Sequence, residues 1–86
     1  MSGGPVVTLI GRSGCHLCDI ARSVVGQALA RAPFELVEID VDSDPELRAE
    51  YGDQVPVVLV DARMHSFYEV DQDSLLAAVA AARNVR

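Results

Sequence analysis

The chain has 86 residues, of which 50% are hydrophobic and 23% are charged, and this predicts one globular domain over residues 1–86. The formal net charge is −6, and all seven basic residues are arginines. Because an acidic domain repels phosphate groups, the composition argues against nucleic acid and anionic membranes as partners.

The first half of the chain predicts a strand, a helix and a second strand. Residues 6–10 form a short β-branched run between a proline and a glycine, which is typical of a buried strand. From Leu17 onward, apolar residues recur with the spacing of one helix face, and Pro33 ends this helix. Residues 34–41 predict a second strand. In such a unit the two strands are expected to be parallel, with a right-handed crossover.

A short helix is predicted after the second strand. Ser43 and Glu46 fit a capping box, and Pro45 suits the first helical turn. Gly52 stands where a C-terminal cap belongs. The helix is therefore expected to begin within residues 42–46 and to end before Gly52.

The last third of the chain predicts a hairpin followed by a helix. Residues 57–60 predict a third strand, residues 61–63 a turn, and residues 65–70 a more polar strand at a sheet edge. Asp71 is placed to cap a helix that carries apolar residues on one side, namely Leu75, Leu76, Val79 and Ala80. The order β-α-β-α-β-β-α predicts an α/β domain with a four-stranded mixed sheet and three helices.

The edge strand carries two adjacent aromatic residues and a histidine. Strand alternation predicts that Phe67 and Tyr68 point to opposite sides, one into the core and one into solvent. A substrate-facing patch made by both rings is the other interpretation. His65 is expected in solvent.

Neither a membrane-spanning helix nor a signal peptide is predicted. The longest apolar run, residues 75–82, is far shorter than the about 20 residues that a span needs. The first five residues carry no basic side chain, and the apolar run after them is too short for a signal peptide. We therefore expect a cytoplasmic protein. In a reducing compartment, a close cysteine pair is more often redox-active or metal-binding than structural.

The two cysteines stand in the motif Cys15-His16-Leu17-Cys18, which follows a strand and opens a helix. A thiolate is the nucleophile in disulfide exchange, and a helix N-terminus stabilises its negative charge. Cys18 lies almost one helical turn after Cys15 and can close a disulfide with it. We expect Cys15 to attack a substrate disulfide and Cys18 to resolve the mixed disulfide. Arg12, on the preceding turn, can add positive charge near the thiolate.

His16 has two interpretations. In its protonated form it would stabilise the Cys15 thiolate and make the disulfide more oxidising. Alternatively, it is an exposed polar residue without a role.

Other roles for the cysteine pair remain open at this point. Both residues can simply pack in the core, because cysteine is among the most buried residue types. The pair can also hold zinc, with His16 or His65 as further ligands, but no second paired motif completes a tetrahedral set.

The combination of these features resembles the thioredoxin superfamily. It consists of a strand, the CxxC motif, an amphipathic helix, an aspartate-rich end of the second strand, and a Val-Pro pair before the third strand. Length and order are similar to glutaredoxins, and the run from Gly14 to Asp19 resembles short glutaredoxin-like proteins of bacteria. The resemblance covers residues 6–82 and implies a thioredoxin-like fold of the glutaredoxin type.

The resemblance also implies roles for two further residues. In the superfamily, a cis proline precedes the third strand and lies next to the active cysteine, and Pro56 matches that position. The resemblance implies that the Val55–Pro56 bond is cis and that the Val55 backbone meets the substrate chain.

Two departures from glutaredoxins concern glutathione. Arg12 and Val55 match a basic residue and a Val-Pro segment that bind it, but residues 65–69 contain no glycine where the family has a Gly-Gly pair. Those glycines let the backbone approach the ligand's carboxylate closely. Leu17 also replaces the usual aromatic residue before the second cysteine. The resemblance implies disulfide exchange, and these departures from the family pattern argue against a dedicated glutathione site.

The favoured function is that of a small monomeric redoxin without a bound cofactor. It would exchange disulfides with protein or low-molecular-weight substrates and receive electrons from glutathione, another thiol or a flavin reductase. The alternative is a non-catalytic module that holds zinc or an iron–sulfur cluster through Cys15 and Cys18, or that acts as a redox sensor.

Overall fold

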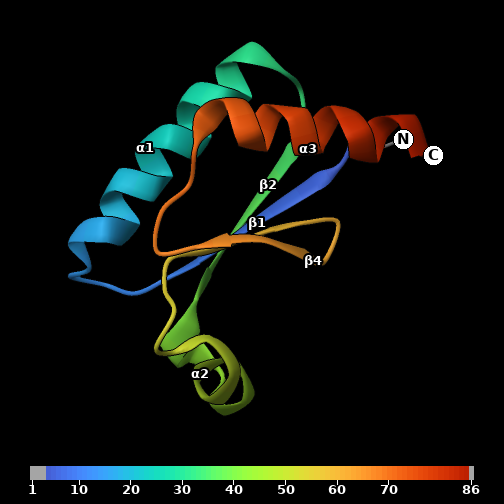
Figure 1. The fold of residues 1–86 in the computed structure, drawn as a ribbon. Coiled ribbons are helices and arrows are strands. Elements are labelled where there is room, and N and C mark those ends of the chain that lie inside the picture. Colours follow the sequence, from blue (N-terminus) through green and yellow to red (C-terminus); the bar gives the residue numbers. More distant parts are fainter. Residues whose placement is uncertain (1–3, 86) are drawn as a thin grey trace.

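Four strands form one mixed sheet at the centre of the fold, in the order β2-β1-β3-β4 (Figure 1). The structure is a computed structural model and describes residues 4–85. The strands are β1 (Val6–Gly11), β2 (Glu35–Asp40), β3 (Val57–Val60) and β4 (Arg63–Phe67). β1 pairs in parallel with β2 and antiparallel with β3, and β3 pairs antiparallel with β4. The predicted mixed sheet and the parallel pair are confirmed.

Within residues 4–85, three α-helices flank this sheet (Figure 1). α1 (His16–Arg31) and α3 (Gln72–Val85) lie together over one face. α2 (Pro45–Tyr51) lies on the other side and follows η1 (Val41–Ser43), a single 3-10 turn. The chain therefore has three layers, with the sheet between the long helices and the short one.

Each face of the sheet has its own core, because side chains alternate along the strands. The larger cluster lies beneath α1 and α3 and consists of Val7, Leu9, Ala21, Val25, Ala28, Phe34, Val58, Val60, Leu75 and Val79. The smaller one, on the side of α2, consists of Ile10, Val41 and Val57. The buried stripe of α1 is narrower than its apolar pattern predicts, since Leu17, Ile20 and Leu29 are exposed.

The predicted capping box of the short helix is wrong in one residue. Asp44, not Ser43, is the N-cap of α2, and its carboxylate accepts a hydrogen bond from the Glu46 backbone N–H at 2.8 Å. The Ser43 hydroxyl instead donates to the Asp40 carbonyl at 2.6 Å. Asp44 is the N-cap because Ser43 is the last residue of the 3-10 turn η1, so α2 begins one residue later than the predicted capping box requires. Gly52 is the C-cap, as expected.

The hairpin turn is shorter than predicted, and the edge strand begins and ends earlier. Two residues, Asp61 and Ala62, connect β3 to β4, with φ of 50° and 70°. Positive φ at both central positions matches the right-handed twist of the strands. The Asp61 carboxylate also accepts a hydrogen bond from the Val6 N–H at 3.0 Å, which ties the turn to the start of β1.

Within residues 4–85, no helix is long and apolar enough to cross a membrane.

Candidate functional site

Cys15 is the N-cap residue of α1. Its sulfur accepts a hydrogen bond from the Cys18 backbone N–H at 3.1 Å, and its carbonyl accepts one from the Asp19 N–H at 3.1 Å. The loop before it turns at Gly14, whose φ of 74° is in the left-handed region that favours glycine. Because free N–H groups at a helix N-terminus stabilise negative charge, this position favours a thiolate at Cys15.

Cys15 and Cys18 are joined in a disulfide, with their Cα atoms 5.1 Å apart. The two residues differ in exposure, since Cys15 is partly exposed whereas only 1% of Cys18 is. An incoming disulfide therefore has access to Cys15 and not to Cys18. This arrangement suits the predicted division into an attacking and a resolving thiol.

Gly11, the last residue of β1, lies directly against Cys18. A Cβ atom at Gly11 would be 3.4 Å from both the Cβ and the Sγ of Cys18. The missing side chain therefore lets the first turn of α1 lie close to the strand, with Cys18 between them.

Three loops meet at the end of the sheet that carries the disulfide: residues 12–15, 52–56 and 68–71 (Figure 1). The end of β1 is paired with the start of β3 through Ile10 and Val57, which brings the loop before β3 beside the cysteine loop. The Arg12 guanidinium donates to the Gly52 carbonyl at 3.2 Å and links the same two loops. The Val55–Pro56 bond is cis, as the resemblance implies.

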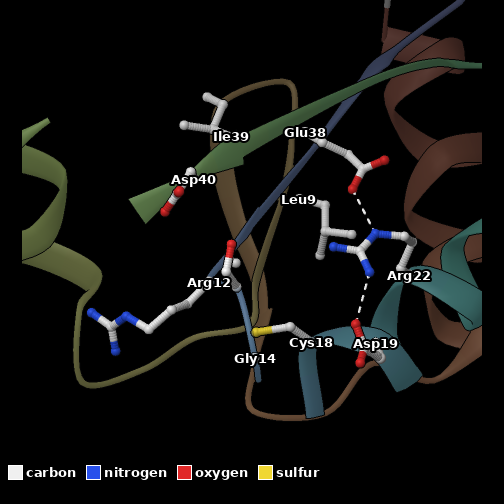
Figure 2. A pocket seen from close by; sticks show the side chains of 11 residues that line it. Leu9, Arg12, Gly14, Cys18, Asp19, Arg22, Glu38, Ile39 and Asp40 are labelled. Atoms are coloured by element: carbon white, nitrogen blue, oxygen red, sulfur yellow. Dashed lines mark hydrogen bonds and ion pairs between the residues drawn. The ribbon is translucent and has the colours of Figure 1, made fainter. Parts of the chain in front are cut away.

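The Arg12 side chain is ion-paired with Asp42, so its charge is not free to act on the cysteines alone. Its guanidinium donates to both carboxylate oxygens of Asp42, at 2.8 and 3.1 Å. This hydrogen-bonded pair raises the pKa of Arg12, with smaller contributions from Asp40 and Asp53, and lowers the pKa of Asp42. Figure 2 shows the side chain extending away from Cys18. The effect of Arg12 on the thiolate stays a prediction.

A cavity of about 410 Å³ opens beside Cys18, between β1, β2 and the start of α1. Two ion pairs that share Arg22 line this cavity. The Arg22 guanidinium donates to Glu38 of β2 at 2.8 Å and to Asp19 of its own helix at 2.9 Å (Figure 2). These groups give the buried sulfur a polar wall. The sequence offers only the Asp19–Arg22 spacing as a signal, because the contact with β2 requires the fold.

The segment after β4 differs most from the expectation. Phe67 and Tyr68 are both exposed, 49% and 47% respectively, so the predicted split between core and solvent is wrong. The reason is that β4 ends at Phe67 and Tyr68 takes a φ of 67°, which ends strand alternation. The Tyr68 N–H donates to the Pro56 carbonyl at 2.9 Å and the Gln54 carbonyl at 3.3 Å. Its hydroxyl donates to the Asp53 carbonyl at 2.8 Å.

The model of the family described as "Glutaredoxin-like domain (DUF836)" matches residues 6–80. The chain belongs to this glutaredoxin-like family.

This glutaredoxin-like protein is similar in sequence to a mycobacterial protein and in fold to solved structures. The uncharacterized protein Rv0508 of Mycobacterium tuberculosis is 41% identical over 81 residues, covering 88% of this chain and 84% of its own. The solution structure of Ne2328 from Nitrosomonas europaea has a TM-score of 0.78 at 27% identity, covering 92% of this chain and 95% of that one. A chloroplastic thioredoxin z has a TM-score of 0.76 at 16% identity, covering 95% and 80%, and shows the thioredoxin fold alone.

The two histidines lie in different surroundings. His16 is the first residue of α1 and is exposed. His65, expected in solvent, is half-buried on β4. Burial lowers its pKa, and the negative charge of Asp71 acts in the opposite direction with a smaller effect. In the part of the glutaredoxin-like chain that the structure describes, no three histidine, cysteine, aspartate or glutamate residues cluster as a metal site would require.

Proposed function

We propose that this glutaredoxin-like protein carries out dithiol–disulfide exchange, with Cys15 as the nucleophile and Cys18 as the resolving thiol. The observation that carries the proposal is the pairing of an accessible sulfur at a helix N-terminus with a buried sulfur three residues later. A helix N-terminus lowers the pKa of a thiol, and only an accessible thiolate can attack a substrate disulfide.

The reaction proceeds in two exchanges. The Cys15 thiolate attacks one sulfur of the substrate disulfide, forms a mixed disulfide and releases the other half as a thiolate, which takes up a proton. Cys18 then loses its proton and attacks the Cys15 sulfur, which forms the Cys15–Cys18 disulfide and releases the second substrate thiol. The substrate gains two electrons, and the protein dithiol loses them. An external thiol or a flavin-dependent reductase restores the dithiol.

We propose that the cis-proline loop and Val55 hold the substrate, and that protein or low-molecular-weight disulfides of the cytoplasm are the substrates. His16, one residue from the nucleophile, is proposed to tune the thiolate when it is protonated.

A redox titration of the purified protein, read by thiol-specific mass labelling, tests the proposal. The pair is expected to cycle as a two-electron couple between ~−270 and ~−180 mV, the range from thioredoxin to disulfide isomerase. Cys18→Ser should trap a mixed disulfide on Cys15, whereas Cys15→Ser should form none. A pair that never closes a disulfide in solution, or that is protected from labelling by a metal found on elemental analysis, would contradict catalysis and favour the binding-module alternative.

A further inference from the structure

Tyr68 fastens the loop at residues 68–71 to the cis-proline loop. Its backbone N–H binds the carbonyls of Pro56 and Gln54, and its hydroxyl binds that of Asp53. Three of the five residues in the loop at 52–56 therefore contact one tyrosine. The Tyr68 side chain therefore lies beside the loop that contains Val55.

Two of the four backbone N–H groups of residues 68–71 are hydrogen-bonded within the protein. The Tyr68 N–H is shared between two carbonyls, and the Glu69 N–H donates to the Phe67 carbonyl at 2.8 Å. At the start of α3, the Asp71 carboxylate accepts from the Ser74 N–H at 2.8 Å. Free N–H groups of loops and helix starts are what bind ligand anions. Here the protein's own oxygens take the N–H groups of Tyr68, Glu69 and Ser74.

The two loops beside the cysteine loop carry a net negative charge. The loops at 52–56 and 68–71 contain Asp53, Glu69 and Asp71 and no basic residue. Among residues 4–85, none of these three carboxylates is in an ion pair. The cation of the cysteine loop, Arg12, is bound to Asp42. A thiol that carries carboxylates would meet repulsion here, and a basic segment would meet attraction.

Exposed apolar side chains occur at the end of β4 and within the cysteine motif. Phe67 and Tyr68 contact each other edge to face, with ring centroids 5.1 Å apart, and both rings are about half exposed. Leu17, between the two cysteines, is 43% exposed. Aromatic residues are enriched where proteins contact polypeptides, because they bury a large area with few rotatable bonds.

From these observations we propose that the site reacts with disulfides in basic, apolar polypeptide segments and rejects anionic thiols such as glutathione, with Tyr68 as the specificity-determining residue. This proposal rests on the proposed exchange activity. The occupant is an extended protein segment, since positive side chains complement Asp53, Glu69 and Asp71 while the aromatic pair covers its apolar side chains.

The test measures how fast the reduced protein attacks matched disulfides. Three peptides of one length carry arginine, serine or glutamate on both sides of a cysteine that is joined to 2-mercaptoethanol. Glutathione disulfide and bis(2-hydroxyethyl) disulfide complete the set, and the latter is the neutral reference. In each reaction Cys15 displaces one half of the disulfide as a thiol and Cys18 then displaces the other, so mass labelling of the protein follows every substrate alike.

The arginine peptide is expected to react about 10-fold faster than the glutamate peptide at low ionic strength, with the difference shrinking at high salt. Glutathione disulfide should be slower than the reference. Glu69→Arg should lower the ratio of the rate with the arginine peptide to the rate with the glutamate peptide. Glu35→Arg makes the same charge change at the far end of β2 and should leave this rate ratio largely unchanged. Tyr68→Gly should raise the rate with glutathione disulfide relative to the reference, and Tyr68→Phe, which keeps the ring, should not.

Two outcomes separate this proposal from the exchange activity itself. If the reference reacts while both charged peptides and glutathione disulfide react equally fast, the substrate class is wrong and the exchange activity stands. If even the reference does not react, the proposed function fails and the substrate class with it.

Discussion

At the level of single residues, the ion pair between Arg12 and Asp42 controls the charge beside the cysteine loop. Asp42 accepts two hydrogen bonds from Arg12 and one from Arg48, and the first of these partners lowers its pKa most. A carboxyl whose pKa is lower in the folded chain stabilises the fold above its unfolded pKa. That stability is lost as pH falls through the folded pKa.

Arg12→Gln is therefore expected to raise the pKa of Asp42 toward its ordinary value of 3.8, because the guanidinium that favours the charged form is gone. Carboxyl carbon shifts followed by NMR from pH 2 to 6 measure this change. Arg63→Gln is the control. Arg63 is exposed on β4, at the opposite edge of the sheet from β2, and Asp42 lies in the turn that follows β2. An Asp42 titration that does not move in Arg12→Gln would contradict the prediction.

His65 gives the stability of the protein a dependence on pH near neutrality. Burial lowers its pKa below 6.5, so the unfolded chain binds this proton at a higher pH than the folded chain does. The free energy of unfolding should then rise with pH through this window and fall below about pH 6.5. Urea titrations between pH 5.5 and 7.5 measure the slope, and His65→Gln should flatten it. Equal slopes in both proteins would show that His65 does not contribute.

At the level of elements, α2 depends on its cap. Asp44→Ala is expected to lower the free energy of unfolding by about 1 kcal/mol, because the Glu46 N–H loses its partner. Asp44→Asn keeps an accepting oxygen, so its free energy of unfolding should fall by only a few tenths of a kcal/mol. Urea unfolding at pH 7 with an unchanged m-value checks this. A larger loss for Ser43→Ala than for Asp44→Ala would restore Ser43 as the cap.

Periodicity and turn residues predict the elements well where packing on one face decides them. Residues 6–10 and 57–60 are β-branched runs, and both form central strands. The edge strand is misplaced by two to three residues because Asp61 and Ala62 form the left-handed turn without a glycine, so nothing local marks it. Tyr68 is unpredictable for the same reason, since its positive φ depends on bonds to a loop twelve or more residues away.

The candidate site was predictable in its cysteines and less so in their surroundings. Cys15 and Cys18 form a local motif, and the cis bond at Pro56 follows only from the resemblance, because most bonds before proline are trans. The contacts of Arg12 with Asp42 and of Arg22 with Glu38 join distant segments. Such pairings depend on the register of β1 and β2, which spacing along the chain does not encode.

At the level of the whole molecule, the net charge of −6 should make the fold sensitive to ionic strength. Like charges repel one another more in the compact state than in the unfolded chain, and salt screens this repulsion. The Tm is therefore expected to rise as sodium chloride increases from 20 to 300 mM, as measured by circular dichroism. Glycerol at matched osmolality is the uncharged control. A falling Tm would show that the surface ion pairs outweigh the repulsion.

The two ends of the described chain meet on the side away from the disulfide. Arg83 of α3 donates to the Pro33 carbonyl at 2.7 Å, and a Cβ at Gly4 would lie 3.6 Å from the same guanidinium. β1 then runs about 20 Å from there to the cysteine loop. A linker attached near Gly4 or Arg83 would therefore anchor the protein to an electrode or a bead with its sulfurs facing solution. The same proximity makes the chain suitable for circular permutation, with new ends opened elsewhere in the fold.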